Sequence, residues 1–203
     1  QNRIDITHPL KRLYHSGFVC GGVAIGDFDG DERPDLFLVS GPGQNKLYRQ
    51  TETAFRFEDI TAVAGVGGGK AWGTGAALAD LDNDGDLDIY VCNYDSPNAL
   101  YLNDGTGKFE EAATRFGLAQ VDACLLPTFC DYDQDGDLDV FLLTNRFYRE
   151  GGRPADPPFE QAGNGRAVVK PEFRKFYALT EKGPGKYDMD EAGRPDILLR
   201  NDG

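Results

Sequence analysis

The sequence predicts an all-β fold, a β-propeller built from blades of four short antiparallel strands. Three observations indicate this fold: an acidic nonapeptide recurs at steps of 53 and 51 residues, short apolar runs flank each copy, and turn-forming residues are abundant. Repeats of about 40 to 50 residues with four strands each are typical of propeller blades rather than of helical solenoids. The 26 glycines and 11 prolines among 203 residues also disfavour a bundle of long helices.

The strands are expected in the same order in each copy. The runs GVAIG before Asp27 and LFLV after Asp35 are short and apolar, as expected of buried strands on either side of the acidic loop. The third strand is predicted at LYRQ from Leu47 and the fourth at FRFEDI from Phe55. The second copy repeats this order with AALA, IYV, LYLN and KFEEA. Blades are therefore predicted at about 18–66 and 67–118.

The third copy, at about 119–203, is predicted to contain an insertion. The first residue of the acidic loop precedes the LYxN-like segment by 20 residues in the first two copies, but by 67 residues in the third, where the segment is LLRN from Leu198. About 47 residues are therefore inserted, at 147–194. On this interpretation the chain is part of a larger ring, since a propeller needs at least about four blades.

The insertion is expected to be ordered, because it is rich in aromatic residues. A short helix is predicted to begin near Pro171 and to stop at Gly183 and Pro184, with one face formed by Phe173, Phe176, Tyr177 and Thr180. With Arg146 at its border, the segment has ten basic and eight acidic residues, in contrast to the acidic remainder of the chain. Two interpretations stay open: an element that faces a partner, and a cap folded over its own blade.

The three acidic loops predict metal binding. Each loop has carboxylates at its positions 1, 3, 5 and 9, and alternate residues of a tightly curled loop can direct several oxygens inward. The backbone carbonyl of position 7 can complete the six to eight oxygen ligands that Ca²⁺ takes, whereas Mg²⁺ takes fewer protein ligands. We therefore predict one Ca²⁺ per loop, three in all. The predicted ligands are Asp27, Asp29, Asp31, Arg33 and Asp35; Asp80, Asp82, Asp84, Asp86 and Asp88; and Asp131, Asp133, Asp135, Asp137 and Asp139.

The loops differ from EF-hands and from each other. An EF-hand has Glu at position 12, where these loops have Leu38, Val91 and Leu142. Gly85 and Gly136 at position 6 permit a sharp turn, because glycine tolerates a positive φ. The first loop has Glu32 there, so its site is expected to have the least favourable geometry.

The charge balance points to cations as partners. The chain has 21 basic and 34 acidic residues and a net charge of −13, which disfavours binding to nucleic acid or to an anionic membrane surface. The three loops carry −4, −5 and −5, more than the net charge of the whole chain. A fourth acidic segment, from Asp188 to Asp196, has Ala192 at position 5. It is expected to belong to the insertion, with a fourth, weak metal site as the alternative.

The loops and their flanking strands resemble the FG-GAP or VCBS repeat family, whose members include integrin-α-like propellers. The resemblance rests on GDFDGDERPDLFLVSGPGQNKLYRQ and DLDNDGDLDIYVCNYDSPNALYLNDGTGKFEEAATRFGL, covers about 18–146 and resumes at 195–203. The sequence looks especially like bacterial secreted relatives of the cartilage acidic protein, a group that is associated with an ASPIC/UnbV type of C-terminal region. The resemblance implies a ring of about seven blades, structural calcium, an extracytoplasmic location and a role in adhesion or assembly.

Two classes of function stay open. We expect a noncatalytic calcium-stabilised scaffold that binds a protein or a polysaccharide; the alternative is the propeller portion of a secreted carbohydrate-active enzyme, a lyase or hydrolase. The sequence has no GxSxG or HExxH motif, and its two histidines, His8 and His15, precede the first blade. Trp72 and Tyr94 are expected in the core rather than stacked on a sugar.

The cysteines leave the redox environment of the protein open, and the apolar runs are too short for a membrane span. Cys20, Cys92, Cys124 and Cys130 form no CxxC motif, so two disulfides and buried free thiols are both open. No uninterrupted apolar run approaches the ~18 residues of a membrane span, so no membrane insertion is expected.

Overall fold

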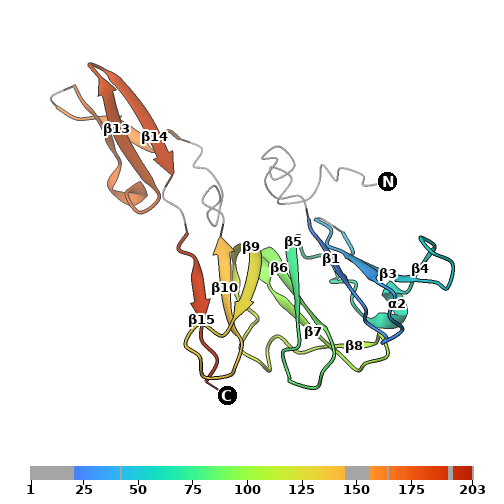
Figure 1. Cartoon of the computed structure of the whole chain (residues 1–203). Coiled ribbons are helices and arrows are strands. Elements are labelled where there is room, and N and C mark those ends of the chain that lie inside the picture. Colours follow the sequence, from blue (N-terminus) through green and yellow to red (C-terminus); the bar gives the residue numbers. More distant parts are fainter. Residues whose placement is uncertain (1–20, 42, 145–155, 164, 192–193, 203) are drawn as a thin grey trace. The chain divides into compact units, whose positions relative to one another are not determined.

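The computed structural model describes residues 21–41, 43–144, 156–163, 165–191 and 194–202 (Figure 1). These residues form two compact units. One contains the described residues up to Leu143 together with those from Asp196 onwards, and the other contains the described residues of Thr144–Pro195. His8, His15 and Cys20 lie outside the described residues.

The first repeat forms a four-stranded antiparallel sheet whose strands pair in sequence order. Its strands are β1 (Val23–Gly26), β2 (Asp35–Leu38), β3 (Lys46–Gln50) and β4 (Phe57–Asp59). A single helical turn, α2 (Thr61–Ala64), follows β4 and ends at Gly65, whose φ of 80° lies in the left-handed region that glycine adopts without strain. The acidic loop joins β1 to β2, which are in register from Val23 opposite Leu38 to Gly26 opposite Asp35.

The second and third repeats share one sheet. Its path is β15-β10-β9-β6-β7-β8, with β5 paired to β6 (Figure 1). The strands are β5 (Gly73–Ala79), β6 (Asp88–Pro97), β7 (Ala99–Asn103), β8 (Phe109–Glu111), β9 (Val121–Cys130), β10 (Asp139–Thr144) and β15 (Ile197–Leu199). The ten-residue β6 makes this join possible, because its first part pairs with β5 and its end, Tyr94–Pro97, pairs with β9.

The side chains of β6 alternate between two apolar cores. Ile89 and Val91 of β6 join the core cluster that contains Phe37 and Leu47 of the first sheet. Tyr90 and Cys92, one residue out of phase, belong to a second cluster together with Leu142 of β10. Successive side chains of a strand point to opposite faces, so one strand contributes to both cores.

The two outer sheet faces remain exposed. On β1, Val23 and Ile25 are 57% and 59% exposed, although their equivalents in the second repeat, 53 residues later, pack into the first core. On the third repeat, Phe141 and Leu198 pair across β10 and β15 and are 40% and 50% exposed. The all-β prediction with antiparallel sheets of short strands is confirmed; the described sheets do not close into a ring.

The insertion forms two hairpins rather than the expected helix. Its elements are β11 (Phe159–Gln161), β12 (Ala167–Val169), the 3₁₀ turn η1 (Pro171–Phe173), β13 (Tyr177–Gly183) and β14 (Lys186–Glu191). The prediction of a helix from Pro171 to Gly183 is therefore wrong beyond its first turn. Gly183 and Lys186 pair across a turn in which Gly185 has φ 70°, as proline followed by glycine favours in a type II turn. The residues taken for a helix stop are thus the tip of a hairpin.

The insertion also has aromatic packing of its own. The rings of Phe173 and Tyr177 meet edge to face with centroids 6.3 Å apart, and Tyr177 is only 5% exposed. Phe159 remains 42% exposed. Among the described residues, no helix combines the length and the apolar character needed to cross a bilayer.

Candidate metal centres

Each acidic loop brings three carboxylates together. One oxygen of each of Asp27, Asp29 and Asp35 lies within 4.8 Å of the other two. The same arrangement recurs in the second and third loops, with Asp80, Asp82 and Asp88, and with Asp131, Asp133 and Asp139. The structure therefore gathers loop positions 1, 3 and 9 of the predicted ligand set at three equivalent places.

Position 1 is the residue around which the loop curls. The Asp27 carboxylate accepts hydrogen bonds from the backbone N–H groups of Gly30 (2.9 Å), Asp31 (3.2 Å) and Glu32 (2.7 Å). The equivalent bonds of the other loops join Asp80 to the N–H groups of Asp84 and Gly85, and Asp131 to those of Asp135 and Gly136, at 3.0 to 3.1 Å. These bonds satisfy backbone N–H groups of the loop that have no hydrogen-bond partner in a β-sheet.

Position 9 fastens the loop to the third strand, a role that the sequence analysis missed. Oδ2 of Asp88 accepts the N–H of Leu81 at 2.7 Å and Oδ1 accepts the N–H of Asn103 at 2.9 Å. Asp35 makes the equivalent bonds with Phe28 and Gln50, and Asp139 with Tyr132 and Asn201. All three position-9 residues are at most 1% exposed. Burial raises the pKa of Asp88 to about 6 in spite of its two hydrogen bonds.

At position 3, two loops have a carboxylate oxygen that no donor satisfies. Oδ1 of Asp29 and Oδ1 of Asp133 are buried and accept no hydrogen bond. Burial, and after it the nearby carboxylates of Asp31 and Asp135, raise the pKa values of these two groups. A buried carboxylate oxygen without a donor costs free energy, and a cation within the cluster would offset this cost. The residues present therefore fit a hard, oxygen-liganded ion.

Positions 5 and 7 are engaged with each other. Oδ1 of Asp84 accepts the N–H of Asp86 at 3.0 Å, and the pairs Asp135–Asp137 and Asp31–Arg33 repeat this bond. The Arg33 guanidinium also pairs with the Asp31 carboxylate. The position-5 carboxylates are not part of the three-residue clusters, and metal ligation stays a prediction for all five loop positions.

The backbone of all three loops is left-handed at positions 4 and 6. The φ values at position 4 are 72° for Gly30, 61° for Asn83 and 63° for Gln134. At position 6 they are 62° for Glu32, 95° for Gly85 and 101° for Gly136. The first loop thus has its glycine at position 4 instead of position 6, and its backbone follows the same path as in the other loops. Glu32 is therefore held in a left-handed conformation, which is unfavourable for a residue with a side chain.

The fourth acidic segment is arranged differently. Asp188 and Asp190 lie on β14, opposite Thr180 and Ala178 of β13. The Asp188 carboxylate lies 3.6 Å from the Lys182 ammonium. These residues belong to none of the three acidic clusters that the described part of the chain contains.

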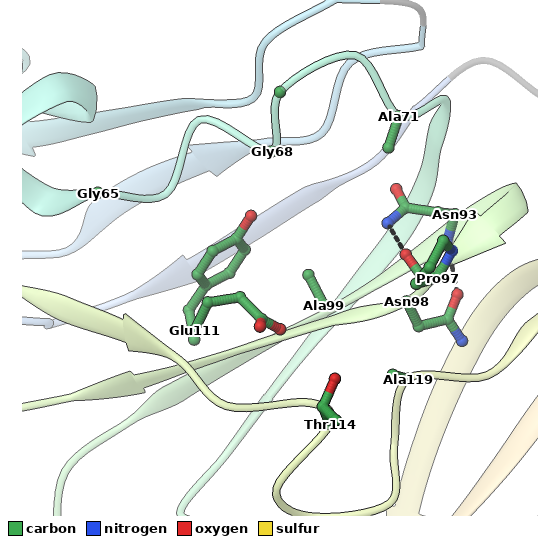
Figure 2. Close-up of a pocket in the computed structure, with 12 residues that line it drawn as sticks. Gly65, Gly68, Ala71, Asn93, Pro97, Asn98, Ala99, Glu111, Thr114 and Ala119 are labelled. Carbon is green, nitrogen blue, oxygen red and sulfur yellow. Dashed lines mark hydrogen bonds between the residues drawn. The ribbon is translucent and has the colours of Figure 1, made fainter.

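A separate cavity of about 370 Å³ lies between the loop after α2 and the turn that joins β6 to β7 (Figure 2). The amides at its wall are engaged with the chain itself: Asn98 accepts the N–H of Asn93 at 2.8 Å, and Asn93 donates to the carbonyl of Pro97 at 2.6 Å. Glu111 is the one carboxylate among the described lining residues, and its Oε1 accepts the N–H of Ala113 at 3.0 Å. The paired carboxylates that most glycosidases use are therefore not found in this lining.

Other candidate groups are buried in the protein core. Trp72 and Tyr94 are 1% and 0% exposed, so neither presents a ring to a sugar. Cys92, Cys124 and Cys130 form no disulfide; the first two are buried and the third is exposed. A hydrogen bond with Cys124, and then burial, raise the pKa of the Cys92 thiol.

Comparison with known proteins agrees with the repeat pattern. The sequence profile of the FG-GAP-like repeat matches residues 27–91 and 80–142, more than half of the chain. The chain is 29% identical over 190 residues to a protein from Xenopus tropicalis named cartilage acidic protein 1, and 30% identical over 191 residues to the protein of that name from Mus musculus. These alignments cover 88% of this chain and 28% of each relative, so the chain spans under a third of the relatives' length. The repeated loops, the strands that hold them and the profile match together show that this chain belongs to the FG-GAP-like repeat family.

Proposed function

We propose that this chain is a noncatalytic, calcium-stabilised portion of an extracytoplasmic β-propeller that binds a protein or polysaccharide partner. The observation that carries the calcium assignment is the buried, unpartnered Oδ1 of Asp29 and of Asp133 within a cluster of three carboxylates. Each ion would be held by positions 1, 3 and 9, with the position-5 carboxylate and the position-7 carbonyl completing its oxygen ligands. Bound calcium would neutralise carboxylates that otherwise repel one another.

Equilibrium dialysis followed by metal analysis tests this proposal. We expect three Ca²⁺ per chain in the unmodified protein, and a melting temperature that falls when EGTA removes them, because an ion held only by the folded state stabilises that state. At a free concentration of 100 times its Kd, each ion contributes about 2.7 kcal/mol. An unchanged melting curve in excess EGTA would contradict structural calcium.

A variant with all three position-3 residues replaced, Asp29→Asn, Asp82→Asn and Asp133→Asn, should bind no calcium. The matched control replaces Asp188 and Asp190 by Asn, since these carboxylates lie on β14 outside the clusters. The control variant should still bind three ions. If it instead loses calcium while the position-3 variant retains it, the ion sites lie in the insertion and the assignment is wrong.

We also propose that further propeller blades cover the two exposed sheet faces. The support comes from the interfaces inside the chain, where the residues equivalent to Phe141 and Leu198 are Tyr90 and Leu100, both fully buried in the second cluster. Replacing Phe141 and Leu198 by Lys should reduce concentration-dependent self-association in sedimentation velocity, because exposed apolar faces of this kind associate. Association of the unmodified chain that these charges leave unchanged would count against the proposal.

The comparisons support a binding role. The repeat family and the relatives named cartilage acidic protein 1 are consistent with a propeller-like binding domain. The extracytoplasmic location rests on the same resemblance. Fractionation of cells that produce the natural protein, with a cytosolic marker as the reference, tests this location. Recovery of the protein in the cytosolic fraction alone would contradict the proposed location.

A further inference from the structure

The three acidic loops differ in one residue of the neighbouring third strand. The residues whose backbone N–H groups bond to position 9 are Gln50, Asn103 and Asn201, which makes them equivalent. The residue that precedes each of them is Arg49 in β3, Leu102 in β7 and Arg200 after β15. The first and third loops thus have an arginine where the second has a leucine.

Both arginines approach the position-3 carboxylate of their own loop. Nη1 of Arg49 lies 3.9 Å from Oδ2 of Asp29, and Nε of Arg200 lies 3.2 Å from Oδ2 of Asp133. Each arginine is also held by a second carboxylate, Glu58 at 2.9 Å for Arg49 and Asp202 at 2.5 Å for Arg200. Each guanidinium group therefore pairs with two carboxylates beside its loop.

The second loop has a different neighbour at this place. Leu102 is 7% exposed and packs in the second core cluster, so this position offers no positive charge to Asp82. The nine residues of the second loop carry five carboxylates and no basic residue. The first loop, by contrast, also contains Arg33, which pairs with Asp31.

The geometry leaves room for both an arginine and an ion. In Asp29 and Asp133 the arginine approaches Oδ2, while the buried Oδ1 accepts no hydrogen bond and is the oxygen available to a cation. A positive charge next to the cluster repels a divalent ion and lowers its affinity. The same charge reduces the repulsion among the carboxylates when no ion is bound.

We propose that Arg49 and Arg200 act as tethered positive charges that set the order in which the loops bind calcium. The second loop fills at the lowest calcium concentration, the third at a higher one, and the first, with two arginines nearby, at the highest. This inference rests on the proposed calcium binding. It adds that the three sites are unequal and names the residues responsible.

Terbium luminescence reports on the third loop. Tyr132 at position 2 of that loop is 48% exposed, whereas the equivalent residues are Phe28 and Leu81, so excitation of tyrosine sensitises Tb³⁺ chiefly there. A Tyr132→Phe variant gives the background from the other aromatic residues. The calcium concentration that displaces half of the sensitised Tb³⁺ then measures the calcium affinity of the third loop.

Arg200→Leu, which copies the second loop, should lower that calcium concentration about tenfold, the effect of one exposed charge close to a divalent ion. Arg200→Lys keeps the charge and should change it little. The control is Arg115→Leu, because Arg115 is an exposed arginine that pairs with Glu110 of β8. This control should leave the displacement unchanged.

Calcium titration calorimetry tests the order of filling. Asp82→Asn should remove the tightest binding phase, and Asp29→Asn the weakest. An Arg200→Leu variant whose third loop binds calcium equally well or more weakly overturns the inference while leaving the calcium proposal intact. An unmodified chain that binds neither Tb³⁺ nor Ca²⁺ overturns both.

Discussion

Replacing Asn103 by Leu is expected to destabilise the protein more than the same replacement at the equivalent residue of another repeat. The Asn103 side chain is 6% exposed and its Nδ2 donates to the carbonyl of Phe28 in the first loop at 2.9 Å and to the carbonyl of Leu87 in the second loop at 3.3 Å. The first of these bonds joins residues 75 positions apart in the sequence. Leucine has the same branched side-chain skeleton and donates no hydrogen bond, so the change removes these two bonds together with the buried Oδ1 of Asn103, which accepts no hydrogen bond.

The magnitude follows from the burial of the two acceptors. Phe28 is 1% exposed, and leaving its buried carbonyl without a donor costs about 1 to 3 kcal/mol. The bond to Leu87 is partly buried, so its loss costs about 0.5 to 1 kcal/mol, since water can replace the donor. We therefore expect the free energy of unfolding to fall by about 1.5 to 4 kcal/mol.

Urea unfolding in EGTA, followed by tryptophan fluorescence, measures this change. Trp72 is the single tryptophan and is 1% exposed, so its emission reports on the unfolding of the unit that contains the three loops. With a typical m value of about 2 kcal/mol per molar urea, the midpoint should shift by about 0.75 to 2 M. The chelator removes any effect of the mutation on ion binding.

The control is Gln50→Leu. Gln50 occupies the equivalent position, its backbone N–H makes the same bond to Asp35, and its side chain is half-buried. We expect a change below about 0.5 kcal/mol for this variant. Equal shifts for Asn103→Leu and Gln50→Leu would refute the reasoning, because the bond between the two loops would then contribute nothing measurable.

Three further predictions concern the first loop, the core and the thiols. Glu32→Gly should raise the free energy of unfolding by about 0.5 to 1 kcal/mol, since glycine adopts a φ of 62° without strain; a loss of stability in urea unfolding would contradict this. Leu142→Ala should cost about 2 to 5 kcal/mol because Leu142 is fully buried, whereas Phe141→Ala, 40% exposed on the opposite face, should cost under about 1 kcal/mol; similar losses would contradict the assignment of faces. Cys130 should react with a thiol reagent in the folded protein at a rate typical of an exposed thiol, and Cys92 only after unfolding; rapid labelling of Cys92 in native buffer would contradict its burial.

The sequence by itself was sufficient for the features that arise within one loop or one strand. The positions of the carboxylates and the left-handed backbone of Gly85 and Gly136 depend on residues at most nine apart, so each copy of the motif contains what is needed to predict them. The alternation of Ile89 with Tyr90 likewise predicts that β6 has two apolar faces.

The local sequence pattern was insufficient to predict the structure where two structures agree with it equally well. In the insertion, the residues from Phe173 to Thr180 have a spacing that suits a helix, and a proline next to a glycine can end a helix or form a hairpin turn. The pairing of Tyr177 with Glu191 in the β13–β14 hairpin decided between them. This pairing contributes a ladder of backbone hydrogen bonds that the sequence of one strand does not reveal.

Only the tertiary structure decided what each face and each carboxylate contacts. Tyr90 and Phe141 occupy the same repeat position, yet Tyr90 is fully buried and Phe141 is 40% exposed, because burial depends on whether another sheet lies against that face. Asp88 looks like one more metal ligand in the sequence, but its oxygens also bond to Leu81 and Asn103, seven and fifteen residues away. The fold determines such partners because a hydrogen bond or an apolar contact depends on distance in space, and residues far apart in the chain meet only once the strands have paired.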